Sequence, residues 1–174
     1  ARVDRANQDH LLTAELQLAH SEGVGASDIP FAVVPADATA AVLLVHGFAA
    51  TPWEMRSLAA YLAKRGLASL AVRLPGHGTT PEDLATRRWE EWLATATRGY
   101  DLLAARFARV YGAGLSTGSL LLLALSLQRQ PTGLILLSPY LRLLHRLLED
   151  KDAFELFGMI IRQFRLTLEF RDAQ

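Results

Sequence analysis

The chain has 174 residues, 51% of them hydrophobic and 21% charged, which favours a single globular domain with a buried core. Its 18 basic side chains balance 18 acidic ones, so we expect no nucleic-acid partner and no attraction to an anionic membrane surface. The absence of cysteine excludes disulfide bonds, thiolate catalysis and cysteine-bound zinc, and no apolar stretch approaches the roughly 18 to 20 residues of an integral membrane helix.

Residues 1–28 are predicted to form an N-terminal helical extension that precedes the main domain. Apolar side chains recur at helical spacing over residues 4–20 and indicate a weakly amphipathic helix. Gly23 and Gly25 interrupt this pattern and predict a loop. The chain then takes on a different, alternating character, so we place a boundary at residue 28.

From residue 29 onward, strand-like runs alternate with helical ones. Short apolar runs predict strands over residues 29–34, 40–45, 67–74, 109–115 and 132–138. Helical spacing predicts helices over residues 51–65, 89–107 and 118–128. Because strands that alternate with helices form parallel sheets through right-handed crossovers, we expect an α/β core with a parallel sheet over residues 29–140.

Beyond Pro139 the pattern becomes purely helical. Apolar stripes over residues 143–148 and 154–168 predict two helices, and a charged joint separates them. We therefore treat residues 141–174 as a separate helical segment.

Gly114-Leu115-Ser116-Thr117-Gly118 is the strongest candidate for a catalytic motif. It lies between a predicted strand and a predicted helix, where a sharp turn can present a serine hydroxyl above the sheet and glycines leave room for crowded backbone. Two alternatives are open: a tight turn in which Ser116 caps the helix, and a dinucleotide-binding loop that begins at Gly112. The second alternative fits poorly, because its last glycine should stand at position 117 and no acidic residue lies near the expected ribose position.

His46-Gly47-Phe48 follows a predicted strand and is the second signal. Acyl transfer needs two backbone N–H donors aimed at the oxyanion, and one of them is expected from this loop. We therefore take the N–H groups of Phe48 and Thr117 as the candidate oxyanion hole. None of the five histidines pairs with another histidine or an acid at metal-ligand spacing, so we expect no metal and no cofactor.

A third motif, Pro75-Gly76-His77-Gly78, lies between these two. In the order and spacing of the three motifs, the chain resembles the α/β-hydrolase family, specifically bacterial carboxylesterases and monoacylglycerol lipases. The resemblance covers residues 29–140. It implies that Ser116 is the nucleophile and that His46 and His77 shape loops instead of serving as the base. It also implies that the final helical segment begins a lid, whose apolar stripes either line an acyl-chain pocket or are ordinary core packing.

The rest of a catalytic triad is not found in the chain. In this fold an acid and then a histidine follow the serine, but the last histidine, His145, precedes Asp150 and Asp152 and lies on a predicted lid helix. The sheet would also lack its last strands and end in an exposed edge, which natural proteins generally avoid. Three explanations are open: a segment of a longer polypeptide, a remainder carried by a second chain that completes the sheet, or a minimal relative that has lost ester hydrolysis.

These observations predict a serine hydrolase that cleaves carboxylic esters through an acyl-serine intermediate, with Ser116 as its catalytic residue. We expect a small-molecule ester or acyl substrate of apolar character and a soluble protein, with a cytoplasmic location slightly favoured. An acyltransferase or a thioesterase would use the same residues. The alternative from another class is a non-catalytic α/β-hydrolase scaffold that binds an apolar ligand or a protein partner.

Overall fold

The computed structural model describes Thr13 and residues 16–139. Its strands are β1 (Phe31–Val33), β2 (Ala40–Val45), β3 (Leu67–Val72), β4 (Val110–Leu115) and β5 (Gly133–Leu137). Its helices include the 3₁₀ turn η1 (Pro52–Met55) and the α-helices α2 (Arg56–Ala63), α3 (Pro81–Thr86), α4 (Trp89–Ala104) and α5 (Thr117–Ser126). The predicted helices at 143–148 and 154–168, and the lid they were expected to begin, lie outside the described residues.

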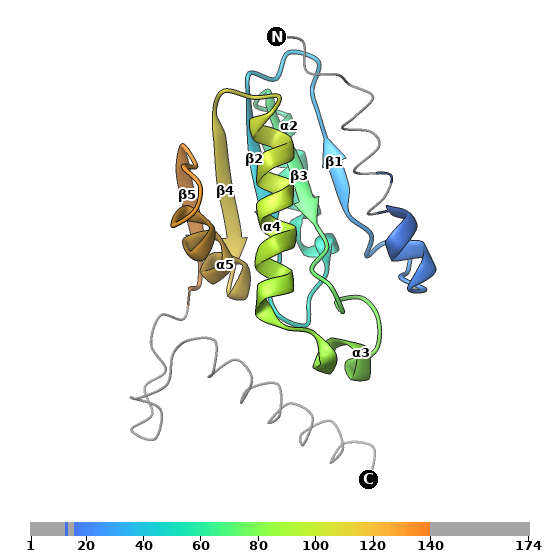
Figure 1. The fold of residues 1–174 in the computed structure, drawn as a ribbon. Helices are drawn as coiled ribbons and strands as arrows, with labels where there is room; N and C mark the ends of the chain where they lie inside the picture. The colour runs from blue at the N-terminus through green and yellow to red at the C-terminus, as the bar shows by residue number, and fades with distance from the viewer. Residues whose placement is uncertain (1–12, 14–15, 140–174) are drawn as a thin grey trace.

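The strands form one five-stranded sheet in the order β1-β3-β2-β4-β5 (Figure 1). The strands β2 to β5 pair in parallel, as predicted, but β1 runs antiparallel to β3. A parallel connection needs a crossover of about a dozen residues or more. Only residues 34–39 join β1 to β2, and they contain a turn in which Ala38 N–H donates to Pro35 O at 3.1 Å. The chain therefore reverses direction there, and β1 is an antiparallel strand at the edge of the predicted parallel sheet.

The short helix α3 was not predicted. It begins at a capped end, where Thr80 Oγ1 accepts the N–H of Asp83 at 3.2 Å and Pro81 occupies the first turn. A capping threonine, a proline and an early acidic residue together form a helix-start signal. Apolar periodicity alone does not detect it, because α3 has no buried residue.

Helices cover both faces of the sheet, as alternate residues of β2 show. Val42 and Leu44 lie in a cluster with side chains of η1 and α2, whereas Leu43 and Val45 lie in a cluster with side chains of α4 and α5. All six residues of β2 are buried, which explains its uninterrupted apolar sequence. Figure 1 shows α4 lying across one face of the sheet, and its Trp92 side chain is only 1% exposed, so the aromatic stripe of this helix belongs to the core.

The parallel strands point the same way, and the loops that follow their carboxyl ends form the candidate site. The strand β2 leads into His46, and its neighbour β4 leads into Ser116. Val45 and Gly114 are paired in register, so the two loops begin side by side. Ligands of open α/β sheets generally bind in the crevice outside these carboxyl ends.

Candidate active site

Ser116 stands at a sharp turn between β4 and α5. Its backbone has φ 51° and ψ −111°, a positive-φ conformation that costs of order 1–3 kcal/mol for a residue other than glycine. Ser116 N–H donates to Leu137 O at 2.8 Å, and Ser119 N–H donates to Ser116 O at 3.0 Å. The Ser116 side chain makes no capping hydrogen bond to α5, so helix capping does not account for this serine.

Gly114 and Gly118 are required by close backbone contacts. A Cβ on Gly118 would lie 2.1 Å from Val45 O, and a Cβ on Gly114 would lie 2.5 Å from the carbonyl carbon of Gly118. Optimal separations between such atoms are about 3.5–4.0 Å, so neither position accepts a side chain. The two glycines around Ser116 thus follow from how closely α5 begins against β2 and β4.

The His46-Gly47-Phe48 loop lies against Ser116. A Cβ on Gly47 would be 3.7 Å from Ser116 Cβ and 3.6 Å from Leu115 O, which leaves little space between the loop and the serine. The loop brings Phe48 into the neighbourhood of Ser116, and Thr117 follows the serine as the first residue of α5. The structure thus places both predicted oxyanion-hole residues in segments that border Ser116.

Glu54 is a residue of this site that was not predicted. Its Oε2 accepts the N–H of Gly47 at 3.0 Å. The contact joins η1 to the loop that precedes it, across seven positions of the chain. No sequence motif marks it, because the carboxylate is brought to the loop by the way the chain turns back after Phe48.

His46 orients the peptide between Gly47 and Phe48. The imidazole is fully buried, and its Nε2 accepts the N–H of Leu74 at 3.2 Å. The proton of the neutral ring is therefore on Nδ1, which donates to Gly47 O at 2.8 Å. Burial, followed by the neighbouring His77, lowers the pKa of His46 from 6.5 to about 3, although the bond to Gly47 opposes the shift. In a planar trans peptide the C=O and the N–H point in opposite directions, so this bond also fixes the direction of the Phe48 N–H.

His77 packs among aromatic rings and is also neutral. Its ring centroid lies 4.9 Å from that of His46 and 5.2 Å from that of Trp92, which donates its indole N–H to Pro75 O at 2.9 Å. Burial lowers the pKa of His77 to about 4. Within residues 16–139, both imidazoles contact backbone or rings rather than the Ser116 hydroxyl. Their geometry fits a role in shaping loops.

Residues 16–28 contact the loops that follow β2 and β3. Arg73, at the end of β3, is 3% exposed and forms a short salt bridge with Glu22. Asp28 Oδ1 accepts the hydroxyl hydrogen of Thr51 at 2.6 Å, beside η1. This part of the predicted N-terminal extension is therefore packed against the α/β core.

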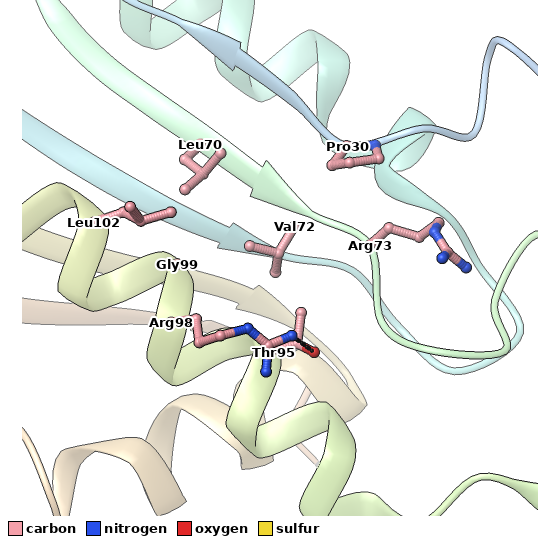
Figure 2. A pocket seen from close by; sticks show the side chains of 8 residues that line it. All are labelled: Pro30, Leu70, Val72, Arg73, Thr95, Arg98, Gly99 and Leu102. Atoms are coloured by element: carbon pink, nitrogen blue, oxygen red, sulfur yellow. Dashed lines mark hydrogen bonds between the residues drawn. The ribbon is translucent and has the colours of Figure 1, made fainter. Parts of the chain in front are cut away.

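A small surface hollow lies between β3 and α4 (Figure 2). Apolar side chains line it together with Arg73 and Arg98, and Arg98 donates to Thr95 Oγ1 at 3.0 Å. Its lining residues come from β3, α4 and their surroundings, not from β4, α5 or residues 46–51. The hollow is therefore separate from the candidate active site.

The described part of the chain contains neither a metal-binding cluster nor a membrane-spanning helix. Its His, Asp and Glu side chains form no group of three that could hold a metal ion. No helix there is long and apolar enough to cross a membrane. The residues considered from the sequence as a possible triad base or acid, His145, Asp150 and Asp152, lie outside the described part.

The mostly parallel sheet, the order of its strands and the glycine-flanked serine at the strand-to-helix turn define an α/β hydrolase. A family model described as serine aminopeptidase, S33, matches residues 36–172. The chain therefore belongs to this family of α/β hydrolases, which confirms the predicted fold class and the family resemblance.

Two curated relatives match about half of the chain. The thermostable monoacylglycerol lipase of Bacillus sp. (strain H-257) is 44% identical over 85 residues, which cover 49% of this chain and 34% of the lipase. The carboxylesterase of Bacillus subtilis (strain 168) is 36% identical over 86 residues, which cover 49% of this chain and 35% of the esterase. The matches thus span only about a third of the length of these relatives.

Solved structures show the same likeness. A structure reported for LipS and LipT, two metagenome-derived lipolytic enzymes, is 29% identical with a TM-score of 0.65, covering 71% of this chain and 50% of that one. A probable hydrolytic enzyme from Pseudomonas aeruginosa PAO1 is 24% identical with a TM-score of 0.53, covering 63% of this chain and 36% of that one, and shows a shared fold alone.

Proposed function

We propose that the protein is a serine hydrolase that cleaves carboxylic esters, with Ser116 as its nucleophile. The observation that carries the proposal is the strained turn at Ser116. Its positive φ has a cost that helix capping does not explain, since the side chain makes no capping bond. A nucleophile elbow has this form, because it exposes a serine hydroxyl at the carboxyl end of a strand.

The N–H groups of Phe48 and Thr117 form the proposed oxyanion hole. Thr117 begins α5, and the first N–H groups of a helix favour negative charge through their orientation and the helix dipole. The Phe48 N–H belongs to the peptide that His46 orients. Both donors would therefore be directed before the substrate arrives, which is the property that makes such groups effective in catalysis.

The proposed reaction has two steps. Ser116 Oγ attacks the ester carbonyl carbon while its proton passes to a general base, and the alcohol leaves with that proton when the ester C–O bond breaks. Water then attacks the acyl-serine with help from the same base, which releases the carboxylic acid and restores the serine. We place the base and its acid partner outside residues 16–139, because His46 hydrogen-bonds through both ring nitrogens and the His77 ring is buried against His46, Phe48 and Trp92.

An ester with an apolar acyl group is the proposed substrate class. It is supported by relatives named as a monoacylglycerol lipase, a carboxylesterase and lipolytic enzymes. Thioester hydrolysis and acyl transfer would use the same nucleophile and the same donors. Comparing an ester with its thioester, and water with an added alcohol as acceptor, distinguishes these reactions.

A non-catalytic scaffold that binds an apolar ligand or a protein partner is the second candidate. The observation that favours it is that no imidazole within residues 16–139 hydrogen-bonds the Ser116 hydroxyl. Apolar side chains on the edge strand β5 are also accessible, with Ile135 48% and Leu137 41% exposed. Such a protein would keep Ser116 but leave it unreactive.

Intact mass measured before and after treatment with a fluorophosphonate probe tests the proposal. The native protein is expected to gain one adduct on the peptide that contains Ser116, and Ser116→Ala to gain none. Hydrolysis of a p-nitrophenyl ester with an initial burst would support the acyl-serine step. A folded protein that remains unlabelled and does not hydrolyse esters would favour the scaffold.

A further inference from the structure

Gly47 carries the peptide that leads to Phe48, yet it has no side chain to restrain its backbone. Three hydrogen bonds hold its two peptide groups, and one of them is a turn bond from the Ala50 N–H to Gly47 O at 3.4 Å. His46 Nδ1 donates to Gly47 O at 2.8 Å, and Gly47 N–H donates to Glu54 Oε2 at 3.0 Å. Because peptide groups are planar, these three bonds together restrain the backbone of Gly47 and the direction of the Phe48 N–H.

Glu54 is held where it can serve as a fixed acceptor. It lies in η1, between the buried residues Pro52 and Met55. Its carboxylate and the serine flank the same open face of the glycine: Glu54 Oε2 and Ser116 Cβ are each 3.7 Å from the position of a Cβ on Gly47. Glu54 itself is exposed, so truncating its side chain leaves no cavity in the core.

We propose that Glu54 is a positioning residue for the ester hydrolysis proposed above, on which this inference rests. By accepting the Gly47 N–H, Glu54 holds the loop so that the Phe48 N–H points at the oxyanion, which forms on the ester carbonyl oxygen when Ser116 attacks. Glu54 does not contact the ester and acts through Gly47. Without it, one of the two peptide groups of Gly47 loses its partner, and the oxyanion donor is no longer fixed before the reaction.

Two substitutions at Glu54 separate its hydrogen bond from its charge. Glu54→Gln keeps an acceptor oxygen and loses the charge, whereas Glu54→Ala loses both. Removing an oxyanion donor outright lowers kcat by about 10² to 10³-fold, so we expect Glu54→Ala, which only loosens that donor, to lower kcat by about 10 to 100-fold with KM nearly unchanged. Glu54→Gln should stay within about threefold of the native kcat.

The experiment measures kcat and KM on the full chain with a p-nitrophenyl ester, together with the melting temperature of each variant. Glu82→Ala is the matched control, because Glu82 is also an exposed glutamate at the start of a helix. Unchanged kcat in Glu54→Ala would overturn the inference, as would a Glu54→Gln variant that falls as far as Glu54→Ala. Where Glu54→Ala fails to fold, the amide exchange of Gly47 in the native protein decides instead, because an unprotected amide would overturn the inference.

Amide hydrogen exchange provides a readout that needs no activity. The Gly47 amide should be protected in the native protein, Glu54→Gln and Glu82→Ala, and should exchange at least about tenfold faster in Glu54→Ala because its acceptor is lost. An unprotected Gly47 amide in the native protein would overturn the role of Glu54. A native protein that neither hydrolyses esters nor binds the probe would instead refute the proposed function, and the exchange data would distinguish the two results.

Discussion

Replacing Ser116 by glycine is expected to stabilise the folded protein while it removes the nucleophile. The positive φ of 51° at this position costs a residue with a Cβ of order 1–3 kcal/mol, whereas glycine adopts such angles freely. Glycine also gives the unfolded chain more freedom, which opposes the gain by about 0.4–1 kcal/mol. We therefore expect Ser116→Gly to be more stable than Ser116→Ala by about 1 kcal/mol.

Ser116→Ala is the necessary comparison, because both variants lose the hydroxyl but only Ser116→Gly removes the strain of the positive φ. Urea denaturation gives the two free energies of unfolding, and a difference of about 1 kcal/mol corresponds to a melting-temperature shift of roughly 2–4 °C in a chain of this size. Ser57, an exposed serine in α2, is the control site, where glycine should be less stable than alanine by up to about 1 kcal/mol. Ser116→Gly that is no more stable than Ser116→Ala would refute the assignment of strain to this turn.

Acidification is expected to destabilise the folded protein. Burial lowers the pKa of His46 from 6.5 to about 3 and that of His77 from 6.5 to about 4. As the pH falls below 6.5, these two imidazoles therefore take up protons only in the unfolded chain, which lowers the free energy of unfolding. Each imidazole should lower the free energy of unfolding by about 2 kcal/mol between pH 6.5 and pH 5, and equal urea midpoints at the two pH values would contradict this. Gly118→Ala should give little folded protein by circular dichroism, because its Cβ would lie 2.1 Å from Val45 O, and a folded variant would show that the contact can relax. Gly47→Ala should fold but react slowly with a fluorophosphonate, because the added methyl lies 3.7 Å from a carbon of the nucleophile, and labelling at the native rate would argue against that placement.

Local sequence predicts features that depend on local contacts. The six apolar residues of β2 indicated a strand buried on both faces, and the structure buries all of them. The glycines on either side of Ser116 predicted a crowded strand-to-helix turn, since the backbone itself needs the space. These features can be predicted from the sequence because each depends on residues that are close together in the chain or on the periodicity of a single strand or helix.

Other features depend on how distant segments meet. The direction of β1 follows from the short connection to β2 and from its pairing with β3, which apolar patterning does not encode. The Glu54 contact depends on the path of the chain between Phe48 and η1. The burial of Arg73 likewise depends on distant contacts, because its guanidinium pairs with Glu22, 51 positions earlier, and donates to His77 O at 3.1 Å.

The contacts of residues 16–28 affect the choice of an N-terminal boundary for a shortened chain that still folds. The family match starts at residue 36, so trimming to that boundary would remove Glu22 and leave the buried Arg73 without its carboxylate partner. Breaking a buried ion pair in this way costs about 3–5 kcal/mol, near the lower figure here because Glu22 is 20% exposed. The loss of Asp28 would also free the Thr51 hydroxyl next to η1. Expression boundaries taken from the family match alone would therefore cut into contacts that support the loops after β2 and β3.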